Sequence, residues 1–336
     1  MPIAIVGAGV MGSEIAWTSA AAGRDVLLID AAPEALAAAR EHVDAITARR
    51  RAKGRLETGE AASIRGRITT AGDTAAVSGC DIIVEAVTER IDVKRAVFAA
   101  LGRHADEGAL LASNTSGLSI SELGTAAGRP GRTVGLHFFN PASVMPLVEV
   151  IRGRETTDDA QAEAMALARA LGKTPVGVRE CPGFLVNRIL TRAMAAAYRV
   201  TETSGSSPAS ADAAIVAAGP APMGPFALGN LVGLDTLSFL LRDLEAAYGE
   251  RFAQGSALPE LVAAGSLGQK TGAGFALADQ APRDRGASAA AEAFYAAAQD
   301  EAKLCRDEQV AAADDIDLAM RLGAGWERGP LEGRAS

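Results

Sequence analysis

The sequence predicts a doubly wound α/β domain followed by an all-α domain that contains a partial repeat. Short apolar runs alternate with helix-like stretches up to about residue 182. From about residue 184 onward no run is convincing as a strand. A Gly-Pro pair also recurs in matching surroundings at 224–225 and 329–330, 105 positions apart. Strands that alternate with helices indicate a mostly parallel sheet with right-handed crossovers.

The first domain is predicted from apolar runs that have the length of strands. Residues 3–6 (IAIV) are wholly apolar, which is typical of a strand buried on both faces. Further runs of this kind lie at 25–29, 81–86, 109–113, 133–137, 147–150 and 175–178. Helix-like stretches between these runs lie at 13–22, 34–53, 92–103 and 160–172.

The second domain is predicted to be helical. Its helix-like stretches lie at 184–203, 209–218, 226–248 and 257–264. The polar segment DQAPRDRGAS contains proline and glycine, which is typical of a linker. We therefore expect two domains, a linker and a further helical segment, with boundaries at 1–182, 183–278, 279–292 and 293–336.

The last of these segments resembles the beginning of the helical domain. When the two Gly-Pro pairs are aligned, Asp212 falls on Asp317 and Phe226 falls on Leu331. We interpret the segment as a second copy of the first helices, cut short where the first copy continues. Chance similarity between alanine-rich sequences is the alternative.

Composition excludes several kinds of partner. The formal charge is −8, whereas nucleic-acid binding needs a basic face. The cysteines Cys80, Cys181 and Cys305 lie far apart and lack metal-type spacing, so we expect reduced thiols and no metal. No apolar run is long enough to span a membrane, and the first residues lack the pattern of a secretory signal. We therefore expect a cytoplasmic protein without nucleic-acid or membrane partners.

A glycine motif after the first strand predicts a nucleotide site. Gly7 allows a tight turn, Gly9 allows a pyrophosphate to approach the backbone, and Gly12 allows close packing of helix on strand. Asp30 ends the second strand, where it can accept hydrogen bonds from ribose hydroxyls and would repel a 2′-phosphate. The motif therefore favours NAD over NADP.

Longer motifs carry a resemblance to a known family. The chain resembles the 3-hydroxyacyl-CoA dehydrogenase family in segments that occur in order: SNTSGLSI (113–120), HFFNPASVMPLVEV (137–150), PGFLVNR (182–188), PMGPFALGNLVGLDT (222–236) and LGQKTGAGF (267–275). The resemblance implies a Rossmann-type first domain that binds NAD. It also implies a helical second domain that forms a homodimer.

His137 is the candidate acid–base residue. Removing the proton from a hydroxyl near neutral pH suits an imidazole, and His137 closes a predicted strand. Glu149 closes the next strand, so its carboxylate can orient the imidazole. The resemblance assigns the same roles to both residues. His42 and His104 lie in polar segments, and we expect them at the surface.

The resemblance also implies residues that bind the substrate. Ser116 and Asn187 match the family residues that hydrogen-bond the substrate oxygens. Neutral donors suit a carbon-3 oxygen that gains negative charge. Lys53 falls where the family contacts coenzyme A, although the basic end of its helix can also serve dipole compensation.

Three further residues fall where the family contacts NAD. They are Glu89, Lys94 and Lys270, each of which has a solvated surface charge as its alternative interpretation. The chain departs from the family's pattern at Pro146, where a lysine is usual, and at Asn230, where an acid is usual. These departures leave acyl-chain length, coenzyme A affinity and dimer packing open.

The resemblance implies NAD-dependent oxidation or reduction at carbon 3 of short-chain (S)-3-hydroxyacyl-CoA or 3-oxoacyl-CoA thioesters. One alternative is a related dehydrogenase of a carrier-protein-bound or non-CoA hydroxy acid. The other alternative is a non-catalytic NAD-binding assembly protein. The physiological direction, the pathway and the role of the truncated repeat stay open.

Overall fold

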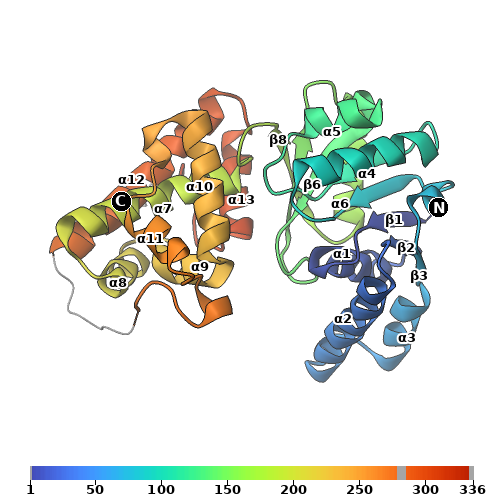
Figure 1. The fold of residues 1–336 in the computed structure, drawn as a ribbon, viewed down its shortest axis with the longest axis horizontal. Helices are drawn as coiled ribbons and strands as arrows, with labels where there is room; N and C mark the ends of the chain where they lie inside the picture. Colours follow the sequence, from blue (N-terminus) through green and yellow to red (C-terminus); the bar gives the residue numbers. More distant parts are fainter. Residues whose placement is uncertain (1, 278–284, 333–336) are drawn as a thin grey trace. The chain divides into compact units, whose positions relative to one another are not determined.

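The computed structural model describes residues 2–277 and 285–332. Contacts between elements divide the chain into two compact units, Met1–Glu180 and Cys181–Ser336 (Figure 1). The first unit combines a parallel sheet with helices, and the described part of the second is helical. The predicted fold class is therefore confirmed.

The first unit is built on one eight-stranded sheet. Its strands are β1 (Ile3–Val6), β2 (Val26–Ile29), β3 (Ile68–Ala71), β4 (Ile82–Glu85), β5 (Leu110–Ser113), β6 (Thr133–Phe138), β7 (Leu147–Arg152) and β8 (Thr174–Arg179). Their spatial order is β3-β2-β1-β4-β5-β6-β7-β8. Chain order therefore runs outward in both directions from the β1–β4 boundary, which is where ligands of doubly wound sheets bind. Strands β6 and β7 are antiparallel, and the other neighbouring pairs are parallel.

Helices cover both faces of this sheet. The helices of the unit are α1 (Val10–Ala21), α2 (Pro33–Ala52), α3 (Thr58–Gly66), α4 (Ile91–His104), α5 (Ile120–Ala127) and α6 (Asp158–Ala170), with short 3₁₀ turns at Thr74–Val77 and Pro130–Arg132. Side chains of α1, α2, α3 and α6 share one apolar cluster with the sheet, and those of α4 and α5 share another. The sheet is thus the middle layer of three.

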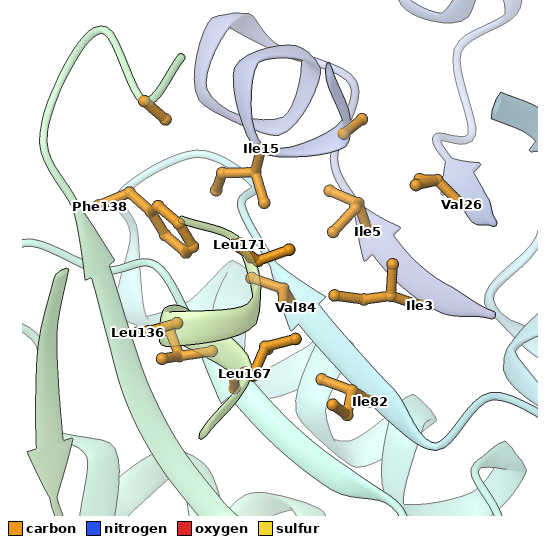
Figure 2. Packing of buried hydrophobic residues seen from close by; sticks show 14 of the residues in the cluster. Ile3, Ile5, Ile15, Val26, Ile82, Val84, Leu136, Phe138, Leu167 and Leu171 are labelled. Atoms are coloured by element: carbon orange, nitrogen blue, oxygen red, sulfur yellow. The ribbon is translucent and has the colours of Figure 1, made fainter. Parts of the chain in front are cut away.

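Each face of the sheet buries alternate residues of the same strands. On one face, Ile3 and Ile5 of β1 pack with Ile15 of α1. Figure 2 shows this layer, in which Leu136 of β6 and Leu167 of α6 lie among the same side chains. Strands buried on both faces need apolar residues at every position. This explains why the sequence shows short apolar runs rather than polar–apolar alternation.

The sequence did not predict strand β3. Its residues (ITTA) include two threonines, and it lies at the edge of the sheet, where burial is only partial. Its place depends on backbone pairing with β2, in which Ile68 lies opposite Val26. An edge strand needs apolar residues on fewer positions, so its sequence signal is weak. Helices α3 and α5 were also not predicted.

The second unit consists of helices in its described part. They are α7 (Val186–Ser204), α8 (Pro208–Ala218), α9 (Pro225–Val232), α10 (Leu234–Tyr248), α11 (Ala257–Ala263), α12 (Arg285–Asp307) and α13 (Ala313–Gly323), with 3₁₀ turns at Glu250–Phe252 and Gln269–Thr271. The single helix expected at 226–248 is wrong, because Gly233 adopts a φ of +107° and separates α9 from α10. Such a φ favours glycine and interrupts a helix.

The segment expected as a linker at 279–292 is helical from Arg285 onward. Four residues near the beginning of α12 are buried, namely Ala287, Ala290, Ala291 and Phe294. Apolar packing therefore stabilises this part of the helix, although the preceding residues are polar and predict a linker. Residues 279–284 of the expected linker lie outside the described residues.

The two proposed copies of the helical segment share a local arrangement. Helices α8 and α13 each have 11 residues and begin 105 positions apart. The Asp212 carboxylate in α8 accepts a hydrogen bond of 2.9 Å from the backbone N–H of Phe226. The Asp317 carboxylate in α13 accepts one of 2.8 Å from the backbone N–H of Leu331. Both aspartates thus receive a backbone N–H just after a Gly-Pro pair.

Packing explains the glycine of each pair. A Cβ on Gly224 would lie 2.2 Å from Asp212 Cγ, and a Cβ on Gly329 would lie 2.1 Å from Asp317 Cβ. Neither distance is possible, so both positions exclude a side chain. Helix α12 packs against α7 and α8, and α13 packs against α12 and α7. We interpret residues 293–332 as a partial copy folded onto the first copy.

Burial raises the pKa of Asp212 to about 6. The folded state therefore binds this proton more readily than the unfolded chain, and the stabilisation present at low pH is lost as the pH rises through about 6. We expect the free energy of unfolding to fall less between about pH 4 and 7 in Asp212→Asn than in the unchanged protein, as measured by urea denaturation. Asp300→Asn, at an exposed position of α12, should keep the original slope. Equal slopes for Asp212→Asn and the unchanged protein would contradict the raised pKa of Asp212.

Candidate active site

A histidine and a glutamate face each other across two antiparallel strands. His137 of β6 is paired in register with Glu149 of β7. His137 Nδ1 lies 2.6 Å from Glu149 Oε2. The histidine is 6% exposed and the glutamate is fully buried. We expected Glu149 at the end of its strand, but it is the third residue of β7. Because β7 runs antiparallel to β6, its beginning reaches the carboxyl edge of the sheet.

The pair has a defined proton arrangement. An ionised carboxylate only accepts hydrogen bonds, so Nδ1 of His137 donates to Glu149. In the neutral imidazole this places the proton on Nδ1 and leaves Nε2 as the basic nitrogen. The ring of Phe139 lies 4.6 Å from the imidazole ring, measured between centroids. Two contacts therefore orient the imidazole of His137, namely the hydrogen bond to the Glu149 carboxylate and the packing against the Phe139 ring.

The glycine loop between β1 and α1 has the geometry of a phosphate cradle. Gly7 has a φ of +107°, and a Cβ there would lie 2.6 Å from the Ala86 carbonyl oxygen. A Cβ on Gly12 would lie 1.8 Å from the Gly7 carbonyl oxygen. A Cβ on Gly9 would meet no atom within 4 Å, and no side chain caps the N-terminus of α1. The open space and the uncapped helix end fit the pyrophosphate of a dinucleotide.

Asp30 lies beside this loop, directly after β2. Its Oδ2 accepts a hydrogen bond of 2.8 Å from the backbone N–H of Ala8, and its Oδ1 accepts one of 3.0 Å from the backbone N–H of Ala32. The two bonds fix the carboxylate next to the glycine turn. This position suits an acceptor for the ribose hydroxyls of NAD.

A buried ion pair occupies the end of β4. Lys94 of α4 is 1% exposed, and its Nζ lies 2.7 Å from Oε1 of the fully buried Glu85. Glu85 also accepts a hydrogen bond of 2.6 Å from the Ser113 hydroxyl at the end of β5. Lys94 was predicted to contact the cofactor, but its ammonium group forms an ion pair with Glu85. Glu85 was not predicted, although an acid at the end of a buried strand (DIIVEA) was the available signal.

Glu89 connects this ion pair to the loop after β5. Its Oε2 lies 3.3 Å from Lys94 Nζ, and its Oε1 accepts hydrogen bonds from the Thr115 hydroxyl at 2.5 Å and the Ser116 backbone N–H at 2.8 Å. Glu89 and Ser116 were both predicted site residues, and the structure brings them together. Thr115 was not predicted; its place two residues after Ser113 in SNTS was the available signal.

Asn114 connects the same loop to the histidine strand. Its Oδ1 accepts a hydrogen bond of 2.9 Å from the backbone N–H of Phe138, the residue after His137. Asn114 therefore holds the loop after β5 against β6. Chains of short hydrogen bonds thus join the carboxyl ends of β4, β5 and β6, and Ser116 and His137 both belong to this edge of the sheet.

The loop after His137 is also held in place. The buried Glu14 of α1 accepts a hydrogen bond of 2.8 Å from the Ser143 backbone N–H, and the Arg50 guanidinium donates to the Ser143 carbonyl. Lys173 donates to the carbonyl of Met145 at 2.9 Å. Burial, and secondly the charge of Arg50, lower the pKa of Lys173 to about 8. Arg50, in the last turn of α2, therefore supports this loop.

Lys53, the predicted coenzyme A contact, is exposed at the C-terminal end of α2. Arg49, Arg50 and Arg51 occupy the last turn of the same helix. The backbone N–H of Lys53 caps the helix by bonding to the Arg49 carbonyl. A cationic side chain at this place is accessible to an anionic ligand.

Two predicted residues lie in the second unit. Asn187 is in the first turn of α7, directly after the turn that Gly183 and Phe184 form. Lys270 Nζ lies 2.6 Å from Oδ2 of Asp235, and this contact lowers the pKa of the aspartate. Asn230, which departs from the family's pattern, both donates to and accepts from the backbone of Phe275 at 2.9 Å. A carboxylate has no N–H to donate, so the amide suits this double contact.

The glycine loop, Asp30 and the doubly wound sheet define a dinucleotide-binding domain. Residues 2–181 match the family model described as "3-hydroxyacyl-CoA dehydrogenase, NAD binding domain", and residues 183–278 match "3-hydroxyacyl-CoA dehydrogenase, C-terminal domain". The chain therefore belongs to the 3-hydroxyacyl-CoA dehydrogenase family of NAD-dependent oxidoreductases, and the predicted resemblance is confirmed.

Individual relatives agree with this assignment. The chain is 38% identical over 274 residues to a probable 3-hydroxybutyryl-CoA dehydrogenase of Bacillus subtilis, covering 81% of this chain and 96% of the relative. A 3-hydroxybutyryl-CoA dehydrogenase structure from Escherichia coli aligns with a TM-score of 0.91 at 28% identity, covering 98% of this chain and 90% of that one. An (S)-3-hydroxybutyryl-CoA dehydrogenase structure from Ralstonia eutropha gives 0.79 at 36% identity, covering 81% and 97%.

Several other features of the described residues bear on partners. No helix within 2–277 or 285–332 is both long and apolar enough to cross a membrane. In the same ranges, no three histidine, cysteine or acidic side chains gather as metal ligands. Cys80 and Cys305 are buried, and burial raises the pKa of both thiols, which disfavours the reactive thiolate.

Gly9 and Gly12 should respond differently to the same substitution. Gly9→Ala adds a methyl group into open space, so we expect an unchanged melting temperature and an NADH dissociation constant raised about 10-fold or more by contact with the pyrophosphate. Gly12→Ala forces the methyl group into the Gly7 carbonyl, so the melting temperature itself should fall. Thermal unfolding and NADH fluorescence titration measure the two effects. Unchanged NADH affinity in Gly9→Ala would contradict the assignment of the glycine loop as the site of the pyrophosphate.

Proposed function

We propose that the chain interconverts a short-chain (S)-3-hydroxyacyl-CoA and the corresponding 3-oxoacyl-CoA, with His137 as the acid–base residue. The observation that carries the proposal is the buried contact of 2.6 Å between His137 Nδ1 and Glu149 Oε2, at the edge of the sheet where the glycine loop lies. The relatives named above as 3-hydroxybutyryl-CoA dehydrogenases support a short acyl chain.

The chain's own residues have separate roles in this reaction. When bound, NAD⁺ accepts hydride from carbon 3, and NADH returns it in the reverse direction. In oxidation, Nε2 of His137 takes the hydroxyl proton, and Glu149 stabilises the imidazolium that forms. Ser116 and Asn187 donate hydrogen bonds to the substrate oxygen, which carries negative charge as the hydride moves. In reduction, the imidazolium returns the proton to the oxygen.

The cofactor side is assigned to Gly7, Gly9, Gly12 and Asp30. We assign a supporting role to Lys94, since its ion pair with Glu85 and its contact with Glu89 hold the loop that carries Ser116. Lys270 remains a predicted cofactor contact. Its ammonium group forms an ion pair with Asp235, which is the alternative role of this side chain.

The coenzyme A part of the substrate is assigned to Lys53. The phosphate groups of coenzyme A are anionic and form strong hydrogen bonds with cationic side chains. Lys53 is exposed and follows the arginines in the last turn of α2. A homodimer through the helical domain and a cytoplasmic location stay predictions. A comparison of acetoacetyl-CoA, acetoacetyl-pantetheine and free 3-hydroxybutyrate as substrates also tests the carrier-protein and non-CoA alternatives.

Replacing either member of the pair should remove the chemistry and spare cofactor binding. We expect His137→Asn and Glu149→Gln to lower kcat for acetoacetyl-CoA reduction by about 100- to 10,000-fold, the range for losing a general acid–base group or its orienting carboxylate. The dissociation constant for NADH should stay within about twofold, because neither residue belongs to the glycine loop. Stopped-flow absorbance and fluorescence titration measure the two quantities.

The control for these variants is His104→Asn, at an exposed position that ends α4. It should keep the original rates. Full activity of His137→Asn would overturn the proposed mechanism. NADH binding by the unchanged protein without reduction of any acyl thioester would favour the non-catalytic alternative.

Lys53→Ala should distinguish coenzyme A from other carriers. We expect KM for acetoacetyl-CoA to rise about 10-fold, corresponding to one lost charge-assisted hydrogen bond, with KM for acetoacetyl-pantetheine unchanged. The pantetheine thioester is the internal control, because it carries the reacting group without the nucleotide phosphates. Equal effects on both thioesters would contradict the role of Lys53. Faster turnover of free 3-hydroxybutyrate than of either thioester would contradict the thioester substrate.

A further inference from the structure

We propose that helix α12 and the turn after it position the active-site residue Asn187, through the charges of Glu301 and Glu308. The link between them is Arg188, the residue after Asn187 in α7. The inference rests on the proposed function in one respect, namely that Asn187 contacts the substrate. It gives the truncated repeat a direct effect on catalysis, in addition to its packing on α7 and α8.

Arg188 is a fully buried cation whose ion pairs cross to Glu301 in α12 and to Glu308, the residue directly after α12. Its side chain is 0% exposed, and its Nε lies 2.7 Å from Oε1 of Glu301, which is 1% exposed. Its Nη1 and Nη2 donate to the two oxygens of Glu308 at 2.7 and 3.0 Å. The second contact is bidentate, which fixes the plane of the guanidinium as well as its position. A buried guanidinium that loses its carboxylates is strongly disfavoured, so Arg188 and α12 constrain each other.

A tyrosine extends the network to the turn before α7. The guanidinium carbon of Arg188 lies 4.2 Å from the ring centroid of Tyr248. The Tyr248 hydroxyl donates a hydrogen bond of 3.1 Å to the Pro182 carbonyl. Arg251 also contacts this ring, with 4.9 Å between guanidinium carbon and centroid, and its Nε donates to Oε2 of Glu301 at 2.9 Å. Glu301 is therefore shared by two arginines that contact one tyrosine.

The turn that this network holds has an unusual backbone. Gly183 has a φ of +75°, and the following residue, Phe184, has a φ of +52° although it is not glycine. Phe184 is fully buried. Left-handed conformations of such residues persist only where the surroundings determine them, and they are common at functional sites. The backbone N–H of Arg188 donates to the Gly183 carbonyl at 3.1 Å, so the arginine contacts the turn directly.

Asn187 lies between the turn and the arginine. The turn fixes where α7 begins, and the ion pairs of Arg188 fix the rotation of its first residues. A change in either would move the Asn187 amide relative to a bound substrate. Misplacement of a reacting or binding group by about 1 Å can cost about 100-fold in rate. Removing charge from Glu301 or Glu308 should therefore reduce catalysis without altering any residue that contacts the substrate or NAD.

The test uses the whole chain and charge-neutralising variants of Glu301 in α12 and of Glu308 directly after it. We expect Glu301→Gln and Glu308→Gln each to lower kcat/KM for acetoacetyl-CoA by about 10- to 100-fold, with the NADH dissociation constant within about twofold. Glu308→Asp, which keeps the charge, should recover part of the loss. Asp300→Asn is the matched control, because Asp300 lies on the same helix, is exposed and pairs with Lys303.

A double-mutant cycle separates positioning from stability. In an Asn187→Ala background, Glu308→Gln should cause little further loss of kcat/KM, because the positioned group is already absent. Glu308 is 41% exposed, so its variant should fold even where Glu301→Gln does not. Melting temperatures recorded for every variant report stability separately. Independent, multiplicative losses in the double variant would overturn the proposal.

Two further outcomes distinguish this inference from the proposed function. If Asn187→Ala is impaired while Glu301→Gln and Glu308→Gln have normal kcat/KM and only lower melting temperatures, the positioning role is overturned and the proposed function stands. If Asn187→Ala itself has normal kinetics, Asn187 has no role at the substrate, and both this inference and that part of the proposed function are overturned.

Discussion

The antiparallel pairing of β6 with β7 is the constraint on which the candidate site depends. In a sheet that is otherwise parallel, this pair brings His137 and Glu149 into register although they are 12 positions apart. A shift of one residue in this register would turn the Glu149 side chain to the opposite face of the sheet. Both strands are buried, so apolar packing on each side holds the register that the carboxylate and imidazole need.

A second principle of the site is that its buried charges are paired. Glu85 has Lys94 and the Ser113 hydroxyl as partners, and Glu149 has His137. In the second unit, Arg188 has the carboxylates of Glu301 and Glu308 as partners. A buried charge is tolerated only when it is paired and hydrogen-bonded. These pairs join the ends of separate strands or helices, so they fix loop positions that apolar packing alone leaves free.

Much of this architecture could be predicted from the sequence. Strands such as β1 and β4 are buried on both faces and therefore appear as apolar runs, whereas the edge strand β3 depends on backbone pairing and leaves little sequence signal. The glycine loop was predictable because its three glycines have a fixed spacing directly after a strand and before a helix. The break at Gly233 was not, because a glycine within a helical pattern does not reveal its own φ.

The site shows the same division between local and tertiary information. The pairing of His137 with Glu149 was predictable because motif spacing is a local property, although Glu149 lies third in β7 and not at its end. The partner of Lys94 was not, because a lysine on a helix gives no sign that Glu85 lies beneath it. The contacts of Arg188 join residues 113 and 120 positions apart, so only the folded structure reveals them.

The proposed chemistry depends on the Glu149 carboxylate, which fixes the proton of His137 on Nδ1 and leaves Nε2 basic. The chain has three histidines, so ¹⁵N-histidine NMR of the NADH complex, with His137→Asn for assignment, observes each ring separately. At neutral pH we predict that His137 shows a protonated Nδ1 and an unprotonated Nε2, and that Glu149→Gln disturbs this arrangement. A neutral His137 with its proton on Nε2, unchanged in Glu149→Gln, would contradict the account.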